Sequence, residues 1–180
     1  MSHPSPHATD FDPGPPGDAS VVPDGDAWTL VFVRDLRHPP ERVWRALTDP
    51  GEVDQWAPFA VARDLGAPGD TTLTMIDGDT RMEQPVTVLR AEAPRVLEYT
   101  WGEDRLRWEL DADGAGTRLT LRHTLAQPGM DAMVAAGWHL CMAVLRRLLD
   151  GAPVGVIRGR DALAYGFDDL RTGYAHRLAR

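Results

Sequence analysis

Two polar residues of this 180-residue chain stand in apolar surroundings where a side chain could do chemistry. His123 alternates with Leu119, Leu121 and Leu125, so the two-residue period of a strand turns its ring toward the leucine side. An apolar wall disfavours the imidazolium ion, and a neutral imidazole keeps one nitrogen that accepts a hydrogen bond. We expect His123 to face a cavity and bind a ligand hydroxyl, although a lone histidine on such a face is more often a satisfied core residue.

Arg34 is the second such residue, since it shares a predicted strand face with Leu30, Phe32 and Leu36. A buried guanidinium needs acceptors, and the sequence identifies none. The simpler interpretation places Arg34 at the rim of a sheet. His139, which follows Trp138 in a helical pattern, is expected to point toward solvent.

Tryptophan is abundant, with six residues in the chain. Core packing accounts for Trp44 and Trp138, whereas Trp101 and Trp108 flank a predicted turn and are placed to line a pocket mouth. The candidate ligand-binding residues are Arg34, Trp56, Trp101, Trp108, His123, Trp138, Cys141 and Met142.

The motifs of common catalytic sites are missing from the sequence. It contains no nucleophile elbow, no glycine-rich phosphate loop, no metal-ligand spacing and no carboxylates paired by a motif. We therefore expect neither a cofactor nor a metal ion, and the sequence leaves open whether the protein catalyses a reaction.

Composition narrows the partners and the compartment. The single cysteine, Cys141, excludes a disulfide within the chain and is expected to pack as a small apolar residue. All 19 basic residues are arginine, they form no stripe, and the net charge is −8, which argues against nucleic acid. Because no apolar run approaches the ~20 residues of a membrane span and no apolar signal segment begins the chain, we expect a soluble, cytoplasmic protein.

The longest helical pattern, residues 130–150, is the element around which the others are arranged. Pro128-Gly129 interrupts the chain before it, Gly151 favours a left-handed helix end, and Pro153 prevents continuation. Apolar residues recur along it at steps of three and four: Met130, Val134, Trp138, Cys141, Met142, Leu145, Leu148 and Leu149.

Shorter elements surround this helix in the sequence. Residues 1–26 are polar and rich in proline and glycine, so we expect a disordered tail before a single domain over residues 27–180. The predicted strands cover residues 28–37, 59–64, 71–76, 81–91, 96–101, 106–110 and 117–125. Helices are predicted after Pro39 and over residues 51–55, and a helix over residues 167–178 is expected to pack outside the core.

This order predicts an α+β fold of the helix-grip kind. A curved antiparallel sheet wraps around the long C-terminal helix, with two short helices after the first strand and an extra C-terminal helix. A curved sheet and a helix touch along one line only, so we expect a gap between them where a small molecule binds.

Three motifs resemble a known family. Residues 39–50, PPERVWRALTDP, followed by Trp56, resemble the opening signature of the SRPBCC superfamily (START-like, Bet v-like), in the AHSA-type branch named after the activator of the heat-shock-protein-ninety ATPase. Residues 93–101 resemble its mid-sheet pattern, and Gly137-Trp138 with residues 166–174 resemble its C-terminal half. The resemblance implies the helix-grip fold in a bacterial protein, but the superfamily includes carriers, receptors, cyclases and co-chaperones.

Our leading hypothesis is the binding of a small hydrophobic ligand between sheet and long helix, in a carrier or sensor. One alternative is a cyclase-like or aromatase-like enzyme that uses His123 or Arg34 in the same cavity. Another, weaker, is an interaction module that acts on a chaperone ATPase. The sequence leaves the ligand and the oligomeric state open, with a homodimer among the possibilities.

Overall fold

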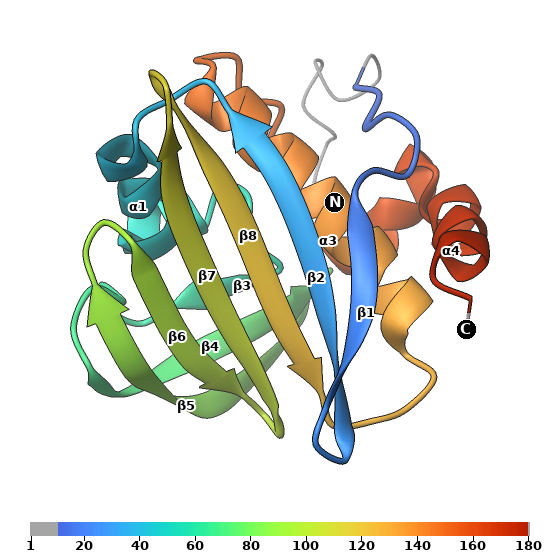
Figure 1. Ribbon diagram of the computed structural model, residues 1–180, viewed down its shortest axis with the longest axis horizontal. Coiled ribbons are helices and arrows are strands. Elements are labelled where there is room, and N and C mark those ends of the chain that lie inside the picture. Colours follow the sequence, from blue (N-terminus) through green and yellow to red (C-terminus); the bar gives the residue numbers. More distant parts are fainter. Residues whose placement is uncertain (1–10, 180) are drawn as a thin grey trace.

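An eight-stranded antiparallel sheet curves around one long helix in the computed structural model of the chain, which describes residues 11–179 (Figure 1). The strand order is β1-β2-β8-β7-β6-β5-β4-β3. The strands are β1 (Ala19–Asp24), β2 (Ala27–Leu36), β3 (Phe59–Val61), β4 (Gly69–Asp77), β5 (Thr80–Glu92), β6 (Val96–Trp101), β7 (Asp104–Asp113) and β8 (Gly116–Leu125). The helices are α1 (Pro40–Thr48), α2 (Pro50–Val53), α3 (Asp131–Leu149), the 3-10 helix η2 (Gly159–Tyr165) and α4 (Phe167–Arg177). The predicted helix-grip fold is confirmed.

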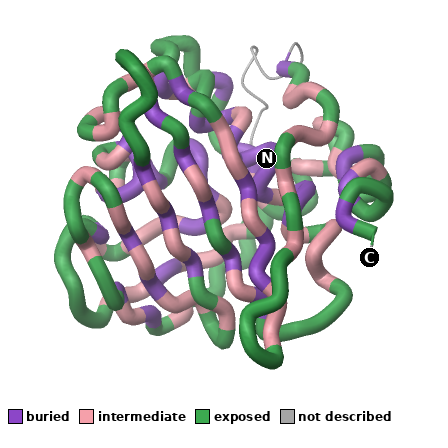
Figure 2. Tube along the Cα trace, viewed as in Figure 1, coloured by how far each residue is buried: buried purple, intermediate pink, exposed green. Residues whose placement is uncertain are grey.

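Buried and more exposed side chains alternate along the neighbouring strands β7 and β8, as Figure 2 shows by the change between purple and lighter segments. Trp108 pairs with Leu121 and Leu106 with His123, and all four side chains are buried on the face toward α3. The turn between these strands is shorter than predicted, because the pairing continues to Asp113 and Gly116. This register fixes which residues of β7 and β8 face the helix.

The long helix α3 is buried on more than one side. Trp138 and Leu145 belong to the predicted apolar stripe, but Ala136, Leu140 and Val144 are equally buried. α3 contacts β2 and α1 on one side and α4 on another, so both sides need apolar residues. By length and composition α3 could cross a bilayer, with a mean hydropathy of 1.3, but 56% of that window is buried inside the protein, as in a core helix.

The predicted disordered tail is wrong for residues 11–26. β1 pairs with β2 from Ala19 opposite Phe32 to Asp24 opposite Ala27, and the Phe11 side chain is buried. The two short helices therefore follow the second strand. Composition alone missed this because one aromatic anchor and a ladder of backbone hydrogen bonds offset the ordering entropy of a polar segment. We call residues 11–18 the strap; residues 1–10 of the predicted tail lie outside the described part.

α4 also departs from the prediction, since it contributes to the core. Tyr174 is fully buried and Leu170 nearly so, and α4 packs along α3. Gly173 lies so close to Pro16 that an added Cβ would stand 2.6 Å from its ring, so the strap presses directly on this helix. The strap, α3 and α4 therefore form one packed unit beside the sheet.

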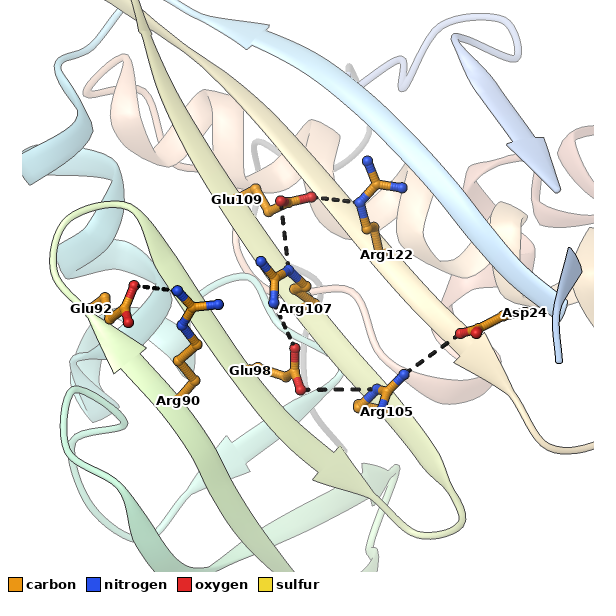
Figure 3. A network of polar contacts seen from close by, with 8 residues as sticks. All are labelled: Asp24, Arg90, Glu92, Glu98, Arg105, Arg107, Glu109 and Arg122. Carbon is orange, nitrogen blue, oxygen red and sulfur yellow. Dashed lines mark hydrogen bonds and ion pairs between the residues drawn. The ribbon is translucent and has the colours of Figure 1, made fainter. Parts of the chain in front are cut away.

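Charged side chains cover the face of the sheet that points away from α3 (Figure 3). Arg107 bridges Glu98 at 3.0 Å and Glu109 at 3.5 Å, and Arg122 pairs with the other oxygen of Glu109. Arg105 reaches Asp24 of β1 at 3.6 Å. Exposed pairs of this kind contribute ~0.2–1 kcal/mol each, so they support strand register more than overall stability.

Deleting residues 1–26 is expected to lower the free energy of unfolding by at least about 2 kcal/mol, the scale of one buried phenylalanine side chain. The reason is the loss of Phe11 and of the β1 ladder together. Urea denaturation measures it, and a chain that begins at Phe11, which keeps every contact described above, is the matched control. Equal stability of the two truncated chains would show that the strap and β1 contribute nothing.

Candidate functional site

The centre of the predicted gap between sheet and helix is filled by aromatic rings. Trp108 makes edge contacts with Trp56 and Trp138, at centroid distances of 5.8 and 5.4 Å. Trp56 donates its indole N–H to the Ala46 carbonyl and Trp108 donates to the Tyr99 hydroxyl. Trp56 and Trp108, both predicted to contact a ligand, are therefore fully buried core residues with satisfied donors.

Open space remains at the N-terminal end of α3, in a cavity of about 350 Å³ that we call the α3 cleft. It is bounded by β4, β5, the β6–β7 turn, the end of β8 and the first turns of α3. The lining residues are Met75, Gln84, Trp101, Gly102, Glu103, Asp104, His123, Leu125, Ala126, Gln127, Met130 and Val134. Trp101 and His123 are the predicted ligand-binding residues that lie here.

Both ring nitrogens of His123 are occupied within the protein. Trp138 donates its indole N–H to Nδ1 at 2.9 Å, and Nε2 donates to a carboxylate oxygen of Asp104 at 2.7 Å. The Trp138 donor requires a lone pair on Nδ1, so the proton of the ring is on Nε2. The expectation that His123 keeps a nitrogen free for a ligand is therefore wrong in this arrangement.

Asp104 is the residue of the cleft that sequence reasoning missed. Its second oxygen accepts the Ala126 backbone N–H at 2.9 Å, and a quarter of its side chain is exposed. Partial burial favours the neutral acid, but the hydrogen bonds from His123 and Ala126 outweigh it and lower the pKa of Asp104. The sequence carried a signal for it. If the predicted strand begins at residue 104, Asp104 shares the inward face with Leu106, which follows two residues later.

A second cavity, of about 380 Å³, lies beneath the strap, and we call it the strap cavity. Its walls come from the strap, β2, β8 and the second half of α3. The lining residues are Pro13, Gly14, Pro15, Gly17, Asp18, Val33, Arg34, Asp35, Leu36, Leu119, His139, Met142, Ala143, Leu145 and Arg146. Two predicted ligand-binding residues, Arg34 and Met142, are among them, so the predicted set is divided between two cavities and the core.

Neutral groups hold the Arg34 guanidinium. It donates to the Tyr174 hydroxyl at 3.1 Å and to the carbonyls of Asp18 at 3.0 Å and Val33 at 2.8 Å. Its carbon lies 4.5 Å from the centre of the Phe32 ring. The acceptors that the sequence did not identify come from α4, the strap and the neighbouring residue of β2.

His139 is buried, so the expectation of solvent exposure is wrong. Its Nε2 donates to the Pro13 carbonyl at 2.8 Å, and its Nδ1 accepts from the Tyr174 hydroxyl at 2.7 Å. Burial is the main effect that lowers the pKa of His139, and the charge of Arg34 lowers it further, which outweighs the hydrogen bond to Pro13. A neutral His139 thus ties the strap to α3 and α4.

Cys141, in the middle of α3, has a buried side chain. Burial raises the pKa of its thiol to about 12, so it stays protonated and behaves as a small apolar side chain. Among residues 11–179, no cluster of three or more histidine, cysteine or acidic side chains could hold a metal ion.

The family follows from comparison with known proteins. The sequence profile described as "Activator of Hsp90 ATPase homolog 1-like protein" matches residues 37–150. The chain belongs to this family. No curated protein matches the sequence of this AHSA1-like chain.

Solved structures agree with the AHSA1-like fold. A conserved protein of unknown function from Enterococcus faecalis is similar over 88% of this chain and 89% of its own, with 17% identity and a TM-score of 0.66. CalU16 from Micromonospora echinospora is similar over 91% of this chain and 97% of its own, with 20% identity and a TM-score of 0.65. An AHSA1 protein from Silicibacter pomeroyi is similar over 68% of this chain and 97% of its own, with 20% identity and a TM-score of 0.59.

Trp138→Ala is expected to lower the free energy of unfolding by about 3–5 kcal/mol, because it opens a void among Trp101, Trp108 and His123. Trp138→Phe keeps most of the volume but leaves His123 Nδ1 without its donor, at a cost of about 1–3 kcal/mol. Urea denaturation compares the two. A smaller loss for alanine than for phenylalanine would show that packing is not the main contribution of Trp138.

The lowered pKa of His139 predicts how stability depends on pH. An unfolded chain takes up a proton at His139 near its ordinary value of 6.5, whereas the folded chain does so only at lower pH. The unfolded state therefore binds more protons in that interval, and the free energy of unfolding falls as the pH falls below about 6.5.

His139→Gln is expected to remove this part of the pH dependence, and His176→Gln, which changes an exposed histidine of α4, should retain it. Denaturation midpoints at a series of pH values from 8 to 5 measure the difference. Parallel curves for His139→Gln and the unchanged protein would contradict the tautomer and the burial described above.

Proposed function

We propose that this AHSA1-family protein binds a small molecule with an apolar, aromatic body in the α3 cleft, as a carrier or sensor. The observation that carries this proposal is the open cleft beside the half-buried Trp101, next to the packed aromatic rings between sheet and helix. Its volume, about 350 Å³, lies within the range of small-molecule sites.

The apolar part of the cleft suits a flat ring. Trp101 forms one wall and is itself braced by Phe59 and Trp138, at centroid distances of 5.2 and 6.0 Å. Met75 and Met130 line the same cleft, and flexible thioether side chains adapt to ligands of different outline. These contacts support an aromatic or alicyclic ligand more than a long extended chain.

The polar part of the cleft favours a ligand that donates hydrogen bonds. Its ionisable lining residues are Glu103, Asp104 and His123, and the lining includes neither arginine nor lysine. Asp104 accepts one hydrogen bond at each oxygen and keeps further lone pairs, whereas His123 has no nitrogen to spare. A phenol or an amine would therefore bind at Asp104, and an anionic ligand would be repelled.

Three naphthalenes of similar shape test this proposal by calorimetry and Trp fluorescence. We expect 1-naphthol and 1-naphthylamine to bind one-to-one and to quench Trp emission. 1-Methylnaphthalene, which lacks a donor, should bind about tenfold more weakly, because a hydrogen bond to a charged acceptor is worth about 1.5–3 kcal/mol.

Trp101→Leu should lower the affinity for all three naphthalenes. Trp44→Leu, which changes a half-buried tryptophan of α1 outside the cleft, is the matched control. Equal affinity for 1-methylnaphthalene and 1-naphthol would remove Asp104 from the proposal. Failure of all three to bind would end the proposal of a carrier for aromatic ligands.

A second candidate is a cyclase-like or aromatase-like enzyme in the same cleft. The observation in its favour is a histidine bonded to a carboxylate at 2.7 Å on the wall of an open cavity, since a catalytic base usually has such an orienting partner. Against it, the lone pair of Nδ1 accepts from Trp138, so His123 takes a ligand proton only after that bond breaks. We rank it second for this reason.

Hydrogen–deuterium exchange at the methyl group of acetophenone, followed by NMR, separates the two candidates. An exchange rate raised by the protein and lost in His123→Phe would place the enzyme first. An unchanged exchange rate, together with naphthol binding, supports the carrier.

A chaperone-directed interaction module, suggested by the family name, ranks third. The large apolar side chains that are exposed among the described residues are scattered over several elements and offer no continuous docking face: Val22, Met82, Leu89, Met133, Val156 and Leu163. The buried state of α3 supports a soluble protein, and we retain the cytoplasm as its proposed compartment.

A further inference from the structure

We propose that the strap cavity is a second binding site, for a small carboxylic acid whose anionic head binds Arg34 and whose apolar body packs on Val33, Met142 and Ala143. It differs from the α3 cleft in location and in having arginine side chains in its lining. It does not depend on the ligand proposed for that cleft.

Arg34 keeps donors that no described residue uses. Of its five N–H groups, two on Nη1 bond to the carbonyls of Asp18 and Val33, and one on Nη2 bonds to Tyr174. The Nε–H and one Nη2–H remain, and charged N–H donors of this kind bind carboxylates strongly. No side-chain nitrogen or oxygen of the described residues is both fully buried and without a partner, so Nε reaches accessible space. The accessible space that Arg34 lines is the strap cavity.

No carboxylate of residues 11–179 contacts Arg34, although Asp18 lies near enough for its charge to raise the pKa of Arg34. Among the described residues, no aspartate or glutamate oxygen forms a salt bridge with it; its partners are two carbonyls and a hydroxyl. Burial lowers the pKa of Arg34, and the charge of Arg146 lowers it further. A half-buried cation that no carboxylate contacts gains from an anion placed at its remaining donors.

Arg146 provides a second positive charge in the wall of the same cavity. It donates to the Asp35 carbonyl at 3.2 Å, and the carboxylate of Asp35 pairs with Arg118 instead. Arg146 is exposed, so its contribution is a screened attraction at the entrance. Two guanidinium groups thus line one cavity, together with apolar side chains and the carboxylates of Asp18 and Asp35.

The strap encloses the cavity and holds Arg34 in place. Gly17 lies against the guanidinium so closely that an added Cβ would stand 2.9 Å from Nη2, and its N–H donates to the Tyr174 hydroxyl at 3.0 Å. Val33, Met142 and Ala143 supply apolar lining, and Leu119 is the cross-strand neighbour of Arg34. An acid with a short alkyl or aryl body therefore finds a charged contact and an apolar contact in one enclosed space.

A purely structural role for Arg34, as a clasp for the strap, is the competing interpretation. It predicts that removing Arg34 lowers stability but gives no reason for carboxylate binding. The experiment therefore needs a readout at the Arg34 Nε–H itself, besides affinity and stability.

Calorimetry with octanoate and octanamide at low ionic strength tests the site in the full chain. We expect octanoate to bind one-to-one, and neutral octanamide to bind at least about tenfold more weakly, the value of hydrogen bonds to a charged partner. In proton–nitrogen NMR spectra the Arg34 Nε–H signal, assigned by its loss in Arg34→Lys, should shift as octanoate is added. Octanamide should leave it unchanged.

Three variants that leave Arg34 in place complete the test. Arg146→Gln should lower the affinity for octanoate by about two- to fivefold, as expected for an exposed charge. Arg147→Gln, which changes the adjacent arginine outside the cavity, should leave that affinity unchanged. His123→Phe, in the α3 cleft, should leave octanoate affinity unchanged. Equal affinity for acid and amide, an unmoved Nε–H signal, or loss of octanoate binding in His123→Phe would each overturn the proposal.

Discussion

The hydrogen bond from Trp138 to His123 is the contact on which the rest of the interior depends, because it joins the long helix to the last strand. It requires Nδ1 to accept, which places the ring proton on Nε2 and orients it toward Asp104. The same indole ring contacts Trp108 and Trp101 and so sets how α3 lies against the sheet. One donor thus fixes a helix orientation, a tautomer and the position of a carboxylate.

Because aromatic rings fill the middle of the helix grip, ligand-sized space is left toward the two ends of α3. The α3 cleft is lined by Asp104 and Glu103 and by none of the described arginines, whereas the strap cavity is lined by Arg34 and Arg146 as well as Asp18 and Asp35. The two spaces therefore present different polar groups. A helix-grip domain of this family can in this way carry two chemically different cavities around one rigid core.

Tyr174 and His139 connect the strap cavity to the rest of the fold. The Tyr174 hydroxyl donates to His139 and accepts from Arg34 and from the backbone of Gly17. These three hydrogen bonds explain why α4 belongs to the core, although the polar residues of that helix predict a peripheral element. Buried polar networks of this kind stabilise only when every member has a partner, which is the case here.

The sequence by itself determined the periodic features of this protein: the strands with His123 and Trp108 facing inward, the apolar helix over residues 130–150, and the family to which they belong. These follow from spacing along the chain, which is a local property. Only the tertiary structure decided which polar atoms meet. Gly17 and Tyr174 are 157 residues apart, and Asp104 reaches His123 across a register that no single strand reveals. Such contacts depend on how distant elements pack, so the division of the predicted site into two cavities and a core could be found in three dimensions alone.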